Sequence, residues 1–278
     1  MPDAMKTGPD PTPATVGPTG VDAYRPAEIA RLIETAGVTK AKLALLPLVA
    51  LGILAGAFIA LGALFYLAVL NGVDPVTGLA RLAGGVAFSL GLILVIVGGA
   101  ELFTGNALLV MARVDRLVTT ADVARNWTIV FVANFAGALL ICALAVAGGL
   151  AETGVGATAA RIVEAKLALP PLQLFARAIL CNVLVCLAVW LSFAARDAAG
   201  KVLVIIPPIA AFVTLGLEHS IANMMLLPFG LLAGAKATVA ESAVNLVIVT
   251  LGNLVGGGGG VALAYWAAYR AGERRSRT

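Results

Sequence analysis

Two apolar stretches in this chain are too long to be single membrane-spanning helices. Residues 82–112 and 202–235 are 31 and 34 residues long. As straight helices they would measure about 46 and 51 Å, against a hydrocarbon core about 30 Å thick. Each holds a polar cluster, residues 101–106 (ELFTGN) in the first and 218–223 (EHSIAN) in the second. We therefore expect each stretch to be a helix that is broken at membrane depth.

A broken helix inside a membrane indicates a cavity. Non-helical backbone leaves N–H and C=O groups without partners, and at membrane depth it is tolerated only where protein buries it or where it lines a water-filled space. Broken helices at equivalent places in two halves of a chain are a sequence pointer to the binding site of a transporter. The two breaks are thus predicted to face a pore.

The rest of the composition also indicates a membrane protein. Of 278 residues, 60% are hydrophobic and only 12% are charged, which excludes an ordinary soluble domain. Together with the two broken stretches, four regular spans give an all-α polytopic protein with six spans, the second and fifth broken. The regular spans are expected at residues 43–70, 127–151, 172–195 and 243–268, after an amphipathic surface helix at 26–36.

The two halves repeat one pattern of polar residues. Glu101 and Glu218 are 117 residues apart, as are Asn106 and Asn223. Asn126, Asn134 and Gly137 in the first half match Asn245, Asn253 and Gly256 in the second, with identical spacings of eight and three. Because each half has three spans, the second copy must be inverted in the membrane. The predicted repeats are residues 40–151 and 160–268.

Charge predicts the domain limits and the orientation. Residues 1–25 are polar and rich in proline, which predicts a disordered tail, and 271–278 form a basic tail around a channel domain at 26–270. With both tails in the cytoplasm, fourteen basic residues lie inside and five outside, a positive-inside bias. The outer five are Arg81, Arg161, Lys166, Arg177 and Lys236.

His219 is the strongest candidate for chemistry. It is the only histidine, and it lies in the second break, where an ionisable group is costly. It is either a neutral ring held by unwound backbone or a proton donor and polar filter for an anion. Under inverted symmetry Thr104 approaches it, unless Thr104 only caps a helix. One histidine without a carboxylate or thiol cluster makes no metal site, and no cofactor is expected.

The other polar candidates each have a structural alternative. Glu101 and Glu218 are expected to bond helix-end amides rather than line a pore. The asparagines Asn106, Asn182 and Asn223 serve equally well as interhelical contacts and as pore donors. Lys166 and Arg177 would either concentrate anions at an entrance or reach lipid headgroups. The glycine run 256–260 is expected to be a close-packing surface, and the three cysteines buried thiols.

Four motifs together resemble the formate/nitrite transporter family. They are ELFTGN (101–106), CNVLVCLAVW (181–190), LEHSIANM (217–224) and GNLVG (252–256), in that order. The resemblance implies an aquaporin-like fold assembled as a homopentamer with a pore in each protomer. It also implies a cytoplasmic constriction of Phe88, Leu92 and Phe103 and a periplasmic one that includes Phe212, although ordinary packing would explain any of these residues. The residues implied at the pore are His219, Thr104, Asn182, Asn223, Lys166, Phe88, Leu92, Leu102, Phe103 and Phe212.

The predicted function is passage of a small weak-acid anion, with formate favoured and nitrite and hydrosulfide as alternatives. By this resemblance the protein lies in a bacterial inner membrane with both termini cytoplasmic, and it is not an enzyme. Its partners would be the anion, the lipid bilayer and its own copies, with no nucleic acid. A neutral-solute channel is disfavoured because the paired Asn-Pro-Ala signature of aquaporins is absent.

Overall fold

The computed structural model describes residues 23–73 and 77–272, and within these ranges every regular element is a helix. The expected tails lie largely outside the described residues. The helices are α1 (Pro26–Ala41), α2 (Leu45–Val69), α3 (Gly78–Gly98), α4 (Leu109–Val114), α5 (Thr120–Ala147), α6 (Gly154–Leu167), α7 (Pro171–Ala194), α8 (Ala198–Thr214), α9 (Ser220–Leu232), α10 (Val239–Leu254) and α11 (Ala264–Tyr269). Short 3-10 helices span Gly105–Leu108 and Leu150–Glu152, and π-helical turns at Val255–Leu263 join α10 to α11.

Both long apolar stretches are broken, as the sequence predicts. Helix α3 ends at Gly98, and the chain is non-helical until the 3-10 helix at Gly105 leads into α4. Helix α8 ends at Thr214, and α9 begins at Ser220. The first break opens on Gly99 with φ 79°, and the second contains Gly216 with φ 65°. A residue without a Cβ adopts these left-handed conformations at little cost, so the glycines let the chain turn out of the helix.

Five helical segments in the described part of the chain are long and apolar enough to cross a membrane. Four are α2, α3, α5 and α7, and the fifth runs continuously from α10 through α11. The two halves of the fifth predicted span, α8 and α9, are shorter apolar helices. The six-span prediction, with breaks in the second and fifth spans, agrees with this arrangement.

Helix starts differ from the hydropathy prediction where capping decides them. Helix α5 begins at Thr120 rather than at 127, because the Thr119 hydroxyl accepts from the Asp122 N–H at 3.1 Å and the Asp122 carboxylate bonds back to Thr119. Thr238 and Glu241 form the same capping box before α10. These turns are polar, so a hydropathy window misses them, although the box itself is a readable sequence signal.

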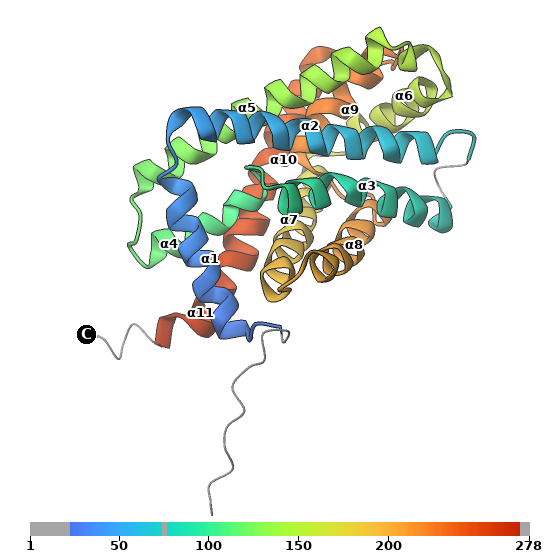
Figure 1. The fold of residues 1–278 in the computed structure, drawn as a ribbon. Helices are drawn as coiled ribbons and strands as arrows, with labels where there is room; N and C mark the ends of the chain where they lie inside the picture. The colour runs from blue at the N-terminus through green and yellow to red at the C-terminus, as the bar shows by residue number, and fades with distance from the viewer. Residues whose placement is uncertain (1–22, 74–76, 273–278) are drawn as a thin grey trace, which may run out of the picture.

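The long helices pack through small residues. In Figure 1, α2 and α5 cross the molecule side by side, and α3 and α8 lie beneath them. A Cβ on Gly56 would collide with the backbone carbonyl of Asn134, and one on Gly256 would collide with that of Ile179. The close-packing role predicted for the glycine run is therefore confirmed for Gly256 and Gly257, whereas a Cβ on Gly259 would meet nothing within 4 Å. The three cysteines are buried and unpaired, also as predicted.

Helix α1 is tied to the end of the last span by charged groups. It extends to Ala41, five residues beyond the predicted surface helix, and it packs on α4 and α11 (Figure 1). The buried Glu34 pairs with Arg270 at 2.8 Å, and the Trp266 indole donates to Asp115 at 2.6 Å. Burial, with a further contribution from Asp115, raises the pKa of Glu34 to about 7, and Arg270 opposes this only in part.

This cluster predicts a pH-dependent stability. Glu34 has a folded pKa above its ordinary value of 4.5, so the folded state binds more protons between that value and about 7. The contribution of Glu34 to the free energy of unfolding is therefore complete at acid pH, and it is lost as the pH rises through about 7. We expect Glu34→Gln, which stays neutral, to lose less thermal stability than wild type between about pH 5 and about pH 8. The measurement is the Tm of detergent-solubilised protein.

The exposed Glu152 gives a matched control for Glu34. A Glu152→Gln variant should keep the wild-type difference in Tm between the two pH values. An equal pH response in Glu34→Gln and wild type would contradict the assignment of that response to Glu34.

Candidate functional site

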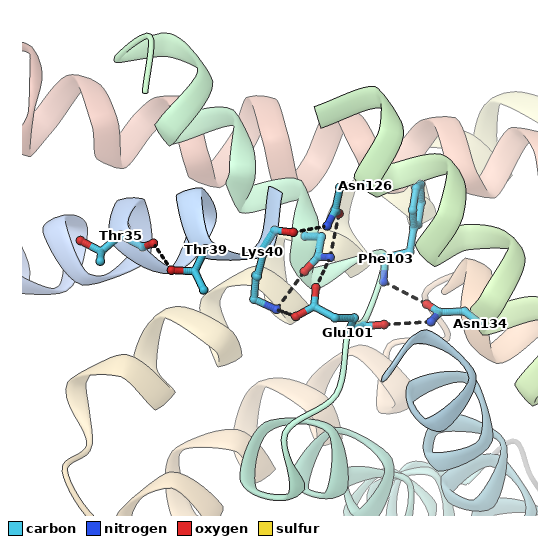
Figure 2. A network of polar contacts seen from close by, with 8 residues as sticks. Thr35, Thr39, Lys40, Glu101, Phe103, Asn126 and Asn134 are labelled. Atoms are coloured by element: carbon cyan, nitrogen blue, oxygen red, sulfur yellow. Dashed lines mark hydrogen bonds and ion pairs between the residues drawn. The ribbon is translucent and has the colours of Figure 1, made fainter. Parts of the chain in front are cut away.

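The first break is held by a lysine, a glutamate and two asparagines. Lys40 at the end of α1 reaches Glu101 at 2.6 Å (Figure 2). The Asn106 amide donates to Glu101 Oε2 at 2.8 Å and to Asn126 Oδ1 at 2.9 Å. The backbone carbonyl of Lys40 in turn accepts from the Asn126 amide at 3.1 Å. The polar side chains of this break therefore satisfy one another within a largely buried network.

The second break repeats this network with its counterpart residues. Lys166 at the end of α6 donates to both carboxylate oxygens of Glu218 at 3.0 Å. The Asn223 amide donates to Glu218 Oε2 and to Asn245 Oδ1, both at 2.9 Å. The prediction that the two glutamates bond helix-end amides is wrong, because each instead accepts from a lysine and an asparagine side chain. The matched contacts follow the sequence repeat, whose inverted arrangement stays a prediction.

Two further asparagines satisfy the backbone of the breaks. Asn134 on α5 accepts from the Phe103 N–H at 2.9 Å and donates to the Glu101 carbonyl at 2.9 Å (Figure 2). Asn253 on α10 accepts from the Ser220 N–H at 2.8 Å and donates to the Glu218 carbonyl at 2.9 Å. Sequence reasoning found these residues as part of the repeat but assigned them no role. Their equal spacing after each break was the available signal.

Thr104 and His219 meet between the two breaks. The Thr104 hydroxyl lies 3.0 Å from His219 Nε2, and both side chains are buried. His219 also caps α9, since its Nδ1 accepts from the Ala222 N–H at 3.1 Å. A ring nitrogen accepts only when it carries no hydrogen. A neutral His219 therefore has its proton on Nε2, where it donates to the Thr104 oxygen and leaves the Thr104 hydrogen free for another acceptor.

Two aromatic rings lie beside the histidine. Phe212 stacks on His219 with ring centroids 5.8 Å apart, and Phe88 meets Phe212 edge to face at 5.5 Å. The prediction that placed Phe88 with Leu92 and Phe103 on the side opposite Phe212 is therefore wrong. Phe88 and Leu92 are four residues apart on one helix face, and their spacing does not reveal which end of a cavity each one reaches.

A cavity of about 210 Å³, here called the His219 cavity, opens on the Phe212 side. Its apolar wall includes Phe88, Phe212 and Leu217. Its ionisable lining consists of Tyr66, Arg81, Arg161, Lys166, Arg177, Glu218 and His219. Four cations thus face one carboxylate, so the cavity attracts anions.

Residues of the first break line a second cavity of about 840 Å³, here called the Glu101 cavity. It is lined by Leu92, Leu102 and Gly105, and by the charged residues Lys40, Glu101, Arg196 and Lys201. Leu102 and Gly105 are close neighbours of Thr104 along the chain. Thr104 itself lines neither cavity; it contacts His219 of the first lining and lies in the chain between Leu102 and Gly105 of the second.

The remaining predicted residues have mainly structural contacts. Asn182 donates to the carbonyls of Thr104 at 3.2 Å and Asn253 at 2.6 Å. Phe103 packs edge to face on Phe131 with centroids 5.1 Å apart. Asn182, Asn223 and Phe103 are absent from the lining of both cavities. Among the described residues, no three His, Cys, Asp or Glu side chains gather as metal ligands would.

The chain is similar to known proteins over most of its length. Residues 27–267 match the family model described as Formate/nitrite transporter. The chain is 43% identical over 255 residues to "Uncharacterized transporter YrhG" of Bacillus subtilis, which covers 90% of this chain and 95% of that protein. It is 37% identical over 271 residues to "Formate channel FocA" of Escherichia coli K12, which covers 89% and 95% respectively.

A solved structure shares the fold. The chain superposes on the structure described as "Pentameric formate channel with formate bound" with a TM-score of 0.73 and 36% identity. The match covers 81% of this chain and 97% of that one.

Proposed function

The chain belongs to the formate/nitrite transporter family, and from this we propose that each protomer passes formate through a pore between the His219 cavity and the Glu101 cavity. The observation that carries the proposal is the Thr104–His219 contact at 3.0 Å, because it joins a titratable ring of the His219 cavity to a hydroxyl whose chain neighbours Leu102 and Gly105 line the Glu101 cavity. The formate channel relatives and the pentameric formate channel support formate as the anion and a homopentamer as the assembly.

The hydrogen-bond geometry suggests how the central pair handles the anion. The Thr104 hydrogen donates to a formate oxygen while neutral His219 donates to Thr104. Protonation of His219 at Nδ1 would break its bond to the Ala222 N–H. The imidazolium is therefore a transient form that the arriving anion stabilises. The extra proton comes from solvent. The imidazolium relaxes when its Nε2–H bond breaks and that proton passes to the Thr104 oxygen while the Thr104 hydrogen forms an O–H bond with formate, which leaves a neutral ring, an intact hydroxyl and formic acid.

The apolar residues near Thr104 and His219 favour the passage of formate as neutral formic acid. Phe88 and Phe212 flank the histidine on one side, and Leu92 and Leu102 line the cavity on the other. An ion loses much of its hydration at such surfaces, and a neutral acid crosses them at much lower cost. A proton would then move with each formate, and the process is transport without chemical conversion of the solute.

We propose that the protein lies in the bacterial inner membrane with both termini in the cytoplasm. Five basic residues are predicted to lie outside the cell, and four of them line the His219 cavity. Of the basic residues predicted to lie inside, Lys40, Arg196 and Lys201 line the Glu101 cavity. This separation of the two sets supports a topology with the His219 cavity facing outward.

Uptake into proteoliposomes tests the function. Vesicles with the purified protein are expected to take up radiolabelled formate at least tenfold faster than empty vesicles. Nitrite and hydrosulfide measured in the same vesicles rank the alternatives, and glycerol is the control for a neutral-solute channel. Entry of glycerol without entry of the anions would contradict the proposal.

A further inference from the structure

Arg81 and Arg177 converge on one point of the second break. A Cβ built on Gly216 would lie 3.9 Å from Nη1 of Arg177 and 4.0 Å from Nη1 of Arg81. Arg177 also donates to the Gly216 carbonyl at 3.3 Å. Because residue 216 is a glycine with φ 65°, no side chain fills the space between the two guanidinium groups. The arrangement is a cradle with a cation on each side, in the wall of the His219 cavity.

The position of Arg81, in the first turn of its helix, does not favour that helix. Arg81 lies in the first turn of α3 and Arg177 in the second turn of α7. The N-terminal end of a helix carries partial positive charge and prefers acidic residues. Both arginines are half-buried within the chain, whereas Arg161 in the same cavity is exposed. Lys166 binds both oxygens of Glu218, the carboxylate among the described residues that line this cavity.

From this geometry, and resting on the proposed function, we propose that Arg81 and Arg177 form an outer binding site that selects anions with two oxygens. Formate and nitrite each present two acceptor oxygens, and guanidinium groups bind such pairs with directed hydrogen bonds. Hydrosulfide has a single heavy atom and gains only the charge attraction. The site therefore loads carboxylate-like anions in front of the Phe88–Phe212 pair and gives hydrosulfide no such advantage.

The test replaces each guanidinium group with the ammonium group of lysine, which keeps the positive charge. In Arg177→Lys, and separately in Arg81→Lys, the external concentration for half-maximal uptake of formate and of nitrite is expected to rise about fivefold, and that for hydrosulfide to stay near the wild-type value. Arg125→Lys makes the same change at an exposed arginine of α5 that lines neither cavity, and it is expected to leave all three values unchanged. Size-exclusion profiles and Tm values identify any variant that fails to assemble.

The outcomes separate this proposal from the proposed function. Equal shifts for formate and hydrosulfide, or equal effects of Arg125→Lys and Arg177→Lys, would overturn the cradle while transport stands. Wild-type values for both cradle variants would overturn it as well. Wild-type vesicles that take up no formate would overturn the function itself. Protection of Arg177 from an arginine-selective dicarbonyl reagent by formate, but not by chloride, would support the cradle without any measurement of flux.

Discussion

Replacing His219 with asparagine or glutamine is expected to remove the proton coupling of formate flux. Asparagine offers an oxygen close to the position of Nδ1 and so keeps the cap on Ala222, while glutamine offers an N–H near Nε2 and keeps the contact with Thr104. Neither side chain titrates. Wild-type uptake is expected to rise about tenfold as the external pH falls from about 7 to about 6, and uptake by both variants to change less than twofold.

Two variants are needed because His219 has two structural contacts. Loss of pH dependence in both, with normal assembly, assigns the effect to the missing proton rather than to the helix cap or the Thr104 contact. A pH profile equal to that of wild type in either assembled variant would refute the proton role. Internal pH measured with a trapped dye checks the coupling directly, because the wild type carries a proton inward with formate and the variants do not.

Replacing Asn253 with alanine is expected to destabilise the second break severely. Its side chain accepts from the Ser220 N–H and donates to the carbonyls of Ala178 and Glu218, at 2.8, 2.8 and 2.9 Å. All of these groups are buried with Asn253, and each unsatisfied one costs about 1–3 kcal/mol. We expect a loss of about 3 kcal/mol or more, seen as a large fall in Tm and little assembled protein.

The same experiment can be carried out in the first half of the molecule. Asn134→Ala removes the corresponding contacts to the Phe103 N–H and to the carbonyls of Gly52 and Glu101, so it is expected to have a similar effect. The exposed Asn71 provides the control, and Asn71→Ala should behave like wild type. Near wild-type stability in both Asn253→Ala and Asn134→Ala would show that the breaks do not depend on these amides.

Much of the fold follows from the sequence because its physical signals are local. The two apolar stretches exceed the bilayer thickness, which alone predicts the breaks, and the polar clusters give their positions. Helix α6 and the last turn of α1 were missed because they are short and only partly apolar. They matter because they supply Lys166 and Lys40 to the two networks. From the sequence, Lys166 is assigned to an anion entrance or to lipid headgroups, and Lys40 is treated only as a topology signal.

The candidate site was predictable in its centre and less so at its edges. His219 and Thr104 were found because one lies in each break and the halves repeat. The side reached by Phe88 and the partners of Glu101 depend on how helices rotate against one another. Those rotations are set by tertiary packing, such as the contact of Gly56 with Asn134, and no single segment encodes them.

The matched Lys–Glu–Asn networks of the two breaks have a consequence for directionality. A solute meets a lysine–glutamate pair in either cavity, Lys166 with Glu218 or Lys40 with Glu101, whereas the apolar lining of the two cavities differs. Any rectification would therefore arise where the two cavities differ, in their apolar residues and in the number of arginines, which among the described lining residues is three in the His219 cavity and one in the Glu101 cavity. Under the proposed proton coupling, the gradients of formate and protons would set the direction of net movement, and reversing those gradients would reverse the flow.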